Sequence, residues 1–349
     1  MFSEWNLRLT NGENLSSDDV TRAVEALLDE TISSETKAEF LIALARKGET
    51  VAEIATFAAE ARKYAIEPPV DAGWRASREI LDVCGTGGDR LNTFNISTTV
   101  GILCAAAGVT VAKHGNRAIT SQSGSADVLE ALGIAVDLPP AEAVRALQRH
   151  GFAFFFAPKY HPAFRHVAAA RKLCAEQGQR TIFNYLGPLL NPARPSVQLL
   201  GVSRPDLCDP LARTLQSLGL RRAMVVCGEV PGGRYLDEIS TLGANQVAEF
   251  HQDRGFSVST WSASDFPLQP ATLADIAGGD RIANAEMIRR ILRGDERGPR
   301  RDTVLLNAAA GLFLAGRVRN LVEGWELAGR TIDTGAAAAK LAALQQPIA

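Results

Sequence analysis

Residues 81–133 read LDVCGTGGDRLNTFNISTTVGILCAAAGVTVAKHGNRAITSQSGSADVLEALG. The apolar run at 80–84 stops at the glycine-rich sequence GTGGD (85–89), which predicts a buried strand that ends in a loop. Glycines leave the backbone N–H groups of such a loop uncovered, so an anionic ligand can approach the main chain closely. Residues 85–89 are therefore a candidate anion-binding turn.

A second polar turn follows at NIST (95–98), where Asn and Ser are good N-cap residues for the apolar stretch 100–107. Gly108 is placed to end that helix. Because a helix N-terminus carries free N–H groups and a partial positive charge, it favours phosphate when it lies beside a glycine-rich loop. The two turns together predict a phosphate site.

Two more polar turns complete the segment. A predicted strand at 109–113 leads into KHGNR (113–117), and SGSAD (123–127) precedes a further helix. Lys113 and Arg117 would place fixed positive charges between the turns. One phosphate needs only one such loop, so this arrangement predicts a ligand with several phosphates. Neither the G-x-x-x-x-G-K-[ST] pattern nor the G-x-G-x-x-G fingerprint is present, which separates the segment from both nucleotide-binding motifs.

The whole chain has 349 residues, of which 46% are hydrophobic, and its formal net charge is −2. This length favours two domains with a sizeable core. The near-neutral charge gives no indication of a nucleic-acid or membrane surface. Its 5 cysteines are scattered, which indicates reduced thiols in a cytoplasmic protein. We expect no signal peptide and no membrane span, because no apolar stretch is long enough.

The rhythm of the sequence changes once along the chain. Residues 1–66 show helical periodicity, with box-like caps expected at Ser16 and Thr50, and the sequence IEPP (66–69) then acts as a linker. From residue 80 onward strands alternate with helices, which predicts an α/β domain with a mostly parallel central sheet. Ligands of such sheets lie at the carboxyl ends of the strands, where GTGGD and KHGNR fall.

The remaining expected elements are read from the same periodicities. We expect strands at 134–136, 152–156, 197–202, 222–227 and 246–250, and helices at 140–148, about 207–218, 303–319 and 323–344.

The sequence HPAFRHVAAAR (161–171) predicts an inserted helix with Pro162 at its first position and His161 as its cap. His161, Phe164 and Arg171 would then share one face. An aromatic surface beside a guanidinium could hold an aromatic carboxylate, since arginine pairs with carboxylates through two donors. An ordinary helix-packing surface is the alternative.

Asp237 and Glu238 stand next to each other in LDEIS, after an apolar strand. They could form a solvated turn. A polyphosphate ligand, however, needs Mg²⁺, which takes carboxylate, hydroxyl and water oxygens. With Asp89 and Ser97, these two residues would supply such oxygens.

These motifs, in this order, resemble the anthranilate phosphoribosyltransferase family of tryptophan biosynthesis. The resemblance extends almost over the full length and adds RTIFN-x-LGPLLNPA and the late LNAAAGL. It implies a small all-helical domain at 1–70, joined by returning helices at about 161–195, and a larger α/β domain at 75–349 of the nucleoside phosphorylase/phosphoribosyltransferase type. It also implies a homodimer that uses Mg²⁺ and binds 5-phosphoribosyl 1-diphosphate and anthranilate.

The resemblance assigns site residues by motif. The substrate-binding set that it implies is Gly85, Gly88, Asp89, Thr93, Asn95, Ser97, Thr98, Lys113, Asn116, Ser121, Ser125 and Arg171, the metal ligands are Ser97, Asp237 and Glu238, and the catalytic pair is Lys113 and His114.

One departure concerns the anthranilate arginine. The spacer at 172–179, between Arg171 and RTIFN, is about three residues longer than in the family pattern. Arg165 therefore competes with Arg171 for the substrate carboxylate, although Arg165 lies off the face expected to carry His161 and Phe164.

The expected chemistry is transfer of the phosphoribosyl group to an aromatic amine. Charge develops mainly on the leaving diphosphate, so its stabilisation by Mg²⁺, Lys113 and the loop amides should dominate catalysis. A proton relay through His114 and a simple hydrogen-bonding role for it both stay open. The alternatives are a pyrimidine nucleoside phosphorylase-like enzyme and a non-catalytic, nucleic-acid-binding relative of the same fold.

Overall fold

The computed structural model describes residues 1–118 and 122–348. Within these residues the strands form one 8-stranded sheet in the order β3-β2-β1-β4-β5-β7-β8, and β6 also pairs with β5. The strands are β1 (Ile80–Gly85), β2 (Thr110–Gly115), β3 (Phe152–Phe156), β4 (Val197–Gly201), β5 (Arg222–Val230), β6 (Arg234–Leu236), β7 (Ala244–His251) and β8 (Gly255–Ser262).

The sheet is parallel where the site is expected. Strands β3, β2, β1, β4 and β5 are mutually parallel, whereas β6, β7 and β8 add antiparallel pairs at one side. In the parallel part Gly85 pairs with Gly201, and Gly115 pairs with Phe156. The ends of β1, β2, β3 and β4 therefore meet at one edge, and the predicted α/β class with a mostly parallel sheet is confirmed.

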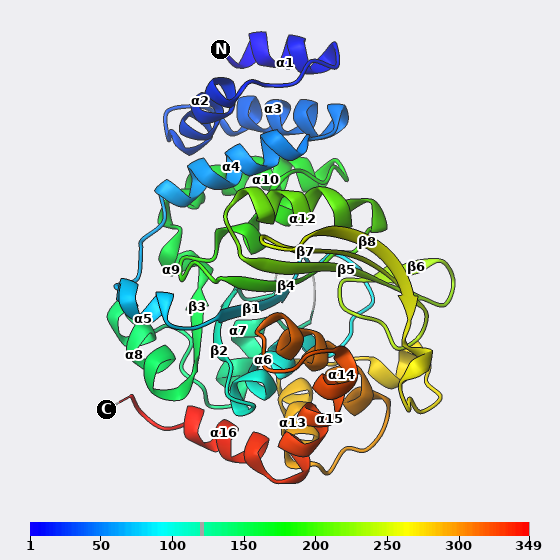
Figure 1. The fold of residues 1–349 in the computed structure, drawn as a ribbon. Coiled ribbons are helices and arrows are strands. Elements are labelled where there is room, and N and C mark those ends of the chain that lie inside the picture. Colours follow the sequence, from blue (N-terminus) through cyan, green and yellow to red (C-terminus); the bar gives the residue numbers. More distant parts are fainter. Residues whose placement is uncertain (119–121, 349) are drawn as a thin grey trace.

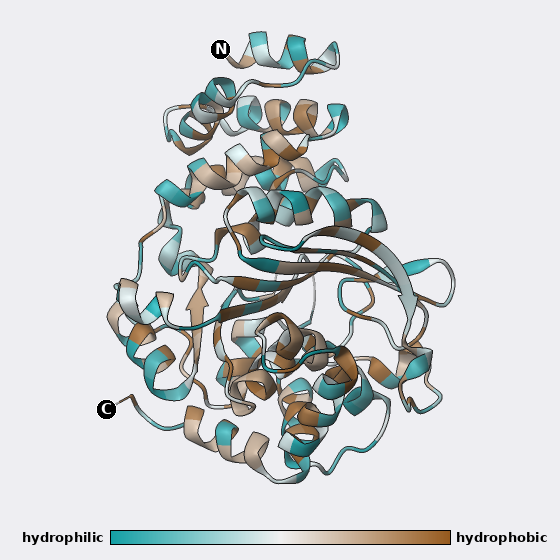
Figure 2. Ribbon diagram, in the orientation of Figure 1, coloured by the Kyte–Doolittle hydropathy of each residue, from teal (hydrophilic) through white to brown (hydrophobic). Residues whose placement is uncertain are grey.

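Alternate residues of the central strands face two different cores. Leu81, Val83 and Leu199 point into a core shared with α6 (Ile96–Ala106) and α14 (Pro299–Leu314). Cys84 and Leu200 point to the opposite core. Burial on both faces explains why these strands are mostly hydrophobic, as the brown central strands of Figure 2 show, with Asp82 in β1 and Gln198 in β4 as buried polar exceptions.

The second core joins the sheet to a helical layer. In Figure 1 the layer is stacked above the sheet, and the C-terminal helices lie below the sheet. The layer contains α1 (Phe2–Thr10), α2 (Ser17–Leu28), α3 (Ser34–Lys47) and α4 (Val51–Lys63). The capping boxes predicted at Ser16 and Thr50 are both present.

A later segment returns to this layer. Helix α10 (Ala168–Glu176) packs on α3, and Cys174 Sγ lies 3.7 Å from the Ala38 carbonyl oxygen. Lys37 Nζ donates to the His166 carbonyl at 2.8 Å. Residues about 100 positions downstream of the linker are thus attached to the N-terminal helices.

The other helices connect strands or close the chain. They are α5 (Ala72–Ala76), α7 (Ser125–Ala131), α8 (Pro140–His150), α9 (Ala157–Tyr160), η1 (Pro162–Val167), α11 (Phe183–Leu186), η2 (Gly187–Leu190), η3 (Pro205–Leu207), α12 (Cys208–Ser217), η4 (Ala263–Asp265), η5 (Leu273–Ile276), α13 (Arg281–Arg293), α15 (Leu321–Asp333) and α16 (Ala336–Leu344). No helix in the described part of the chain combines the length and apolarity that crossing a bilayer requires.

The structure differs from the expected elements at several places. Residues 134–136 are not a strand: Ile134 N–H bonds back to Leu129 O and anchors the end of α7 in the core. The helix expected at 323–344 is two helices, because Gly335 adopts φ +80° between them. Strand β8 was not expected, because its exposed edge carries the polar sequence GFSVSTWS.

The expected helix at 161–171 is also wrong as a single element. It consists of the 3₁₀ helix η1 followed by α10, and His161 makes no side-chain cap. Its aromatic contacts nevertheless form, as described below.

Candidate active site

Two glycines allow the acidic dipeptide to reach the end of the sheet. A Cβ at Gly201 would lie 1.6 Å from the main-chain oxygen of Asp237, and a Cβ at Gly85 would lie 2.2 Å from its Oδ2. Only glycine permits this approach. The Gly87 N–H then donates to Asp237 Oδ2 at 2.6 Å. The turn at 85–89 and the acidic dipeptide are therefore one structure.

Glu238 reaches the second predicted turn. The Ser97 N–H, in the first turn of α6, donates to Glu238 Oε1 at 3.1 Å. Lys113 Nζ donates to Ser97 Oγ at 3.2 Å and to the Val83 carbonyl at 2.7 Å. Both charged groups are buried, with 7% of Glu238 and 2% of Lys113 exposed. The cation from β2 and the carboxylate thus flank the same helix N-terminus.

We call the carboxyl ends of the parallel strands, with the turns at 85–89, 95–98 and 113–117 and the dipeptide Asp237-Glu238, the rim of the sheet. The carboxylates of the rim are not fully neutralised by positive charges nearby. Burial raises the pKa of Asp237 well above its ordinary value, and the charges of Asp89 and Glu238 raise it further. Burial also raises the pKa of Glu238 to about 7, against the opposing effect of Lys113. Oδ2 of Asp89 is buried without a hydrogen-bond partner among the described residues. Such a concentration of carboxylates favours a bound cation.

These side chains fit a magnesium ion that also binds phosphate. Within residues 1–118 and 122–348 no three His, Cys, Asp or Glu side chains form a ready metal cage. Mg²⁺, however, is usually held by one or two carboxylates together with water and phosphate oxygens. Asp237, Glu238 and the Ser97 hydroxyl are the oxygen donors that could hold it.

The next residues expected to contact the donor substrate lie in the loop before α6 and in its first turn. Asn95 Nδ2 donates to the Ser123 carbonyl at 3.1 Å, and Asn95 Oδ1 accepts from Asn284 at 2.9 Å. Thr93 forms a β-bridge with Ala277, and Thr98 is 1% exposed in the first turn of α6. Asn95 and Thr93 are thus fixed by partners from the C-terminal half.

The turn after β2 is held by α7. Ser125 Oγ donates to the Asn116 carbonyl at 3.2 Å, which positions both predicted residues side by side. Arg117 is not a free cation, contrary to expectation, because it is ion-paired with Asp127 and Glu130. It stabilises the turn instead. Ser121 lies outside the described residues.

An aromatic cluster lies next to Lys113 along the chain. The ring centroid of His114 is 5.2 Å from that of His161, which stacks on Phe164 at 5.3 Å. Phe164 meets Phe183 edge-on at 5.9 Å, and the Arg171 guanidinium carbon lies 5.3 Å from the centroid of Phe183. The break between η1 and α10 therefore leaves the predicted combination of aromatic surface and guanidinium intact.

The aromatic cluster combines neutral rings with one positively charged side chain. Burial lowers the pKa of His114 to about 3 and that of His161 to about 4, so both rings are neutral at pH 7. Arg171 forms no ion pair with any described residue. Arg165 is exposed and its Nε donates to His166. The structure thus brings Arg171, and not Arg165, to the aromatic rings.

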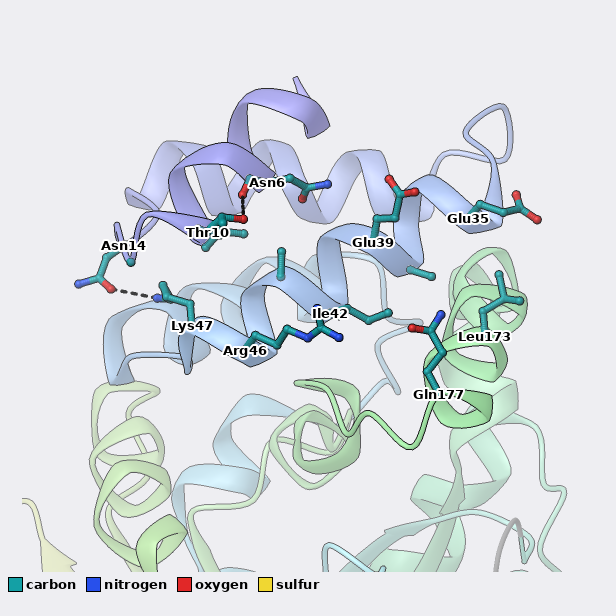
Figure 3. A pocket seen from close by; sticks show the side chains of 14 residues that line it. Asn6, Thr10, Asn14, Glu35, Glu39, Ile42, Arg46, Lys47, Leu173 and Gln177 are labelled. Atoms are coloured by element: carbon teal, nitrogen blue, oxygen red, sulfur yellow. Dashed lines mark hydrogen bonds between the residues drawn. The ribbon is translucent and has the colours of Figure 1, made fainter.

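A large groove lies away from these residues, on the helical layer. A groove of about 1000 Å³ opens on the helical layer between α1, α3 and α10 (Figure 3). Glu35, Glu39, Arg46 and Lys47 give its lining both signs of charge. It has neither the glycine turns nor the aromatic cluster, so it does not compete with the rim as a phosphate site.

Sequence reasoning assigned no role to three residues that the structure places at the site. Gly201 permits the approach of Asp237, Phe183 completes the aromatic cluster, and Arg180 lies over Gly88. Arg180 and Phe183 belong to the motif RTIFN, but the spacing of that motif does not reveal which residues they contact.

Comparison with known proteins agrees with this architecture. The glycosyl transferase family helical bundle domain matches residues 6–65, and the glycosyl transferase family a/b domain matches residues 77–338. The chain is 44% identical to the anthranilate phosphoribosyltransferase of Petrotoga mobilis, over 98% of this chain and 95% of that protein.

Solved structures give the same result. The anthranilate phosphoribosyltransferase (TrpD) of Thermus thermophilus superposes with a TM-score of 0.87 at 39% identity, covering 98% of both chains. The Saccharomyces cerevisiae enzyme in complex with PRPP and Mg has a TM-score of 0.84 at 26% identity, covering 98% of this chain and 96% of that one.

Proposed function

The chain belongs to the anthranilate phosphoribosyltransferase family, and we propose that the rim of its sheet carries out the family's reaction. In that reaction the phosphoribosyl group of 5-phosphoribosyl 1-diphosphate passes to the amine of anthranilate, and pyrophosphate leaves. The observation that carries the assignment of the site is the 2.6 Å hydrogen bond from Gly87 N–H to Asp237 Oδ2. It joins the glycine turn to the acidic dipeptide across 150 residues of sequence.

The donor substrate would occupy the turns at the carboxyl ends of β1 and β2. Gly85, Gly88 and Asp89 belong to the first turn, and Lys113 supplies a buried positive charge 3.2 Å from Ser97 Oγ. Thr93, Asn95, Thr98, Asn116 and Ser125 complete the donor site, and Ser121 is proposed with them from the family motif alone. Fixed N–H groups and a cation stabilise the charge that develops on a leaving diphosphate.

Ser97, Asp237 and Glu238 would hold Mg²⁺. A bound magnesium ion would neutralise diphosphate charge and orient its oxygens. Burial raises the pKa of Glu238 to about 7, and a bound cation would stabilise its ionised form. Lys113 Nζ donates to the Ser97 hydroxyl and Glu238 accepts the Ser97 N–H, so loss of either would disturb the residue proposed as a ligand.

Anthranilate would bind on the aromatic cluster. His161, Phe164 and Phe183 offer a flat apolar surface, and Arg171 offers two parallel donors for the carboxylate. An aromatic amine needs placement opposite the departing oxygen rather than a strong base. His114, neutral and buried, would orient the acceptor, and it can relay the proton that the new arylammonium sheds.

Wider properties follow from the family resemblance and are part of the proposal. We propose a homodimer in the cytoplasm, a helical domain of residues 1–70 joined by about 161–195, and an α/β domain of 75–349. All five cysteines lie in the described residues, buried and unpaired, which supports a reducing compartment. Sedimentation velocity would test the dimer.

Anthranilate fluorescence tests the function directly. Adding 5-phosphoribosyl 1-diphosphate and Mg²⁺ to enzyme and anthranilate should make the fluorescence disappear, and omitting Mg²⁺ should stop the loss. Persistent fluorescence, together with phosphorolysis of a pyrimidine nucleoside, would favour the phosphorylase-like alternative.

A further inference from the structure

Arg180 lies over the glycine turn, although no motif assigns it a role there. It follows α10 after a short loop, and a Cβ on Gly88 would lie 2.6 Å from its Nη2. Nη2 donates to the Gly87 carbonyl at 3.4 Å, and Nη1 donates to Ser203 Oγ at 3.3 Å. Both contacts are near the upper limit for a hydrogen bond.

This guanidinium is not neutralised. It forms no ion pair with any residue in the described ranges, whereas its neighbour Arg204 pairs with Asp206. Asp237 already accepts the Gly87 N–H. Arg180 also stays exposed, so its donors are accessible from the rim. An arginine with a purely structural role would be expected to have a carboxylate partner or short hydrogen bonds.

Charged groups of both signs surround Arg180, and they indicate what kind of ligand it could bind. Arg90 and Arg204 are close enough for their charges to act on it, and so are Asp89 and Asp237. Of these arginines Arg204 is already paired with Asp206, so Arg180 rather than Arg204 is available beside the carboxylates that are proposed to hold Mg²⁺. A magnesium-bound polyanion would meet carboxylates through its metal and guanidinium donors through its free oxygens.

We propose that Arg180 binds the diphosphate of the donor substrate, and the pyrophosphate that it becomes, over the glycine turn at 85–89. This inference rests on the proposed function. Arg180 would leave its weak contact with the Gly87 carbonyl and form a forked pair with diphosphate oxygens.

The contact would also tie the helical layer to the bound donor. Arg180 follows α10, which is attached to α3 through Cys174 and the Ala38 carbonyl. Binding of diphosphate by Arg180 therefore fixes the returning segment that carries Arg171. Donor binding would thus bring the anthranilate arginine into register with the rim.

Calorimetric titration of magnesium pyrophosphate into the full-length protein tests the proposal without catalysis. Arg180→Gln should weaken binding at least tenfold, because a charge-assisted forked pair is lost. Arg204→Gln is the matched control: this arginine is adjacent but already paired with Asp206, so its affinity should stay within twofold. Wild-type affinity in Arg180→Gln, or no binding by the wild type, would overturn the proposal.

Kinetics then separate binding from structural support. Arg180→Gln should raise the KM for 5-phosphoribosyl 1-diphosphate about tenfold and leave the KM for anthranilate within twofold once the donor saturates. If Arg180→Gln does not fold, Arg180→Lys takes its place: it keeps the charge but loses the fork, so several-fold weaker pyrophosphate binding supports the proposal and unchanged binding contradicts it. A wild type that binds magnesium pyrophosphate but does not consume anthranilate would reject the proposed function alone.

Discussion

The helical layer and the rim of the sheet both bury charged groups, but they treat them in opposite ways. In the helical layer Asp19 accepts hydrogen bonds from Trp5 Nε1 at 3.1 Å, Ser16 Oγ at 2.7 Å and Arg8 at 3.0 Å. Burial alone would raise the pKa of Asp19, yet these partners bring it below its ordinary value. At the rim burial and neighbouring carboxylates raise the pKa of Asp237 and Glu238.

This difference separates charges that build the fold from charges that await a ligand. A buried carboxylate with several donors stabilises the native state, whereas carboxylates crowded together cost stability unless a cation binds. Asp19 and Glu53 belong to the first group, and Asp237 and Glu238 belong to the second. The contrast predicts that changes in the two regions affect different measurements.

The largest effect should come from Glu238→Gln. The amide keeps an oxygen to accept the Ser97 N–H but removes the charge proposed to hold Mg²⁺. We expect kcat to fall by about 10³-fold, comparable to loss of other transition-state charge stabilisation. The melting temperature without ligands should stay the same or rise, because a crowded buried charge is gone. Steady-state kinetics and thermal denaturation provide the two measurements.

Glu229→Gln is the control for that experiment, because Glu229 is exposed on β5 and lies outside the site. It should change kcat by less than twofold. A Glu238→Gln enzyme that unfolds at a much lower temperature would show that the rim carboxylate is structural, and the contrast between the two regions would fail.

The second prediction concerns the helical layer, where removing a buried carboxylate should lower stability and leave activity unchanged. Glu53 accepts from Leu15 N–H and Thr50 N–H, both at 2.8 Å, and pairs with Lys47. Glu53→Ala should cost about 3 kcal/mol or more in the free energy of unfolding, because it leaves a buried lysine unpaired. Urea denaturation measures this loss.

The same variant should keep wild-type kcat per folded molecule. On α4 the exposed Lys63 pairs with the half-buried Glu60, so Glu60→Ala should cost less than about 1 kcal/mol and serves as the control. A Glu53→Ala protein of unchanged stability would mean that its bonds contribute little.

The sequence predicted the parts of this molecule that local chemistry determines. GTGGD, NIST and KHGNR follow strands whose ends meet by parallel topology, and the Ser16 and Thr50 caps follow from spacing alone. The fold class was confirmed for the same reason.

What the sequence could not predict depends on contacts between distant segments. Nothing local shows that Gly201 faces the Asp237 backbone, that Arg180 lies over Gly88, or that Arg117 is neutralised by Glu130. The break after η1 was missed because His161 stacks on Phe164 instead of capping a helix. The alternatives of Arg165 and Arg171 likewise needed three-dimensional contacts.

The third prediction concerns how the free energy of unfolding depends on pH. Burial lowers the pKa of His161 to about 4, whereas an unfolded histidine titrates near 6.5. Between these values the unfolded state binds more protons, so stability falls as pH falls. The loss from pH 6.5 to 5 should reach about 2 kcal/mol for this residue. Denaturant titrations of the ligand-free protein at both pH values measure it.

His161→Gln should remove about 2 kcal/mol of that pH dependence. Asp19→Asn is the comparison from the helical layer: the lowered pKa of Asp19 places its contribution above its unfolded pKa, where it is constant between pH 5 and 6.5. Its variant should lose stability equally at both pH values. An unchanged pH dependence in His161→Gln would show that His161 is already protonated or solvated when folded.

The smallest effect lies where the two regions meet. Arg171 is part of α10, which packs on the helical layer, yet it has no ion pair with a described residue and lies over Phe183. If charged groups without partners mark ligand sites, Arg171 should bind the substrate carboxylate. Arg171→Ala should therefore raise the KM for anthranilate about tenfold, as expected for one lost charge-assisted pair, and leave kcat and the KM for the donor within twofold.

Arg165→Ala is the matched control for Arg171→Ala, because it removes an exposed arginine of the preceding 3₁₀ helix whose Nε donates to His166. Initial rates at saturating donor and varied anthranilate would distinguish the two. If Arg165→Ala raised the anthranilate KM and Arg171→Ala did not, the carboxylate would bind outside the aromatic cluster. An uncompensated charge would then be a poor guide to ligand sites where the helical layer meets the rim. If only Arg171→Ala raises it, the absence of a partner identifies the binding residue even on a helix that otherwise serves packing.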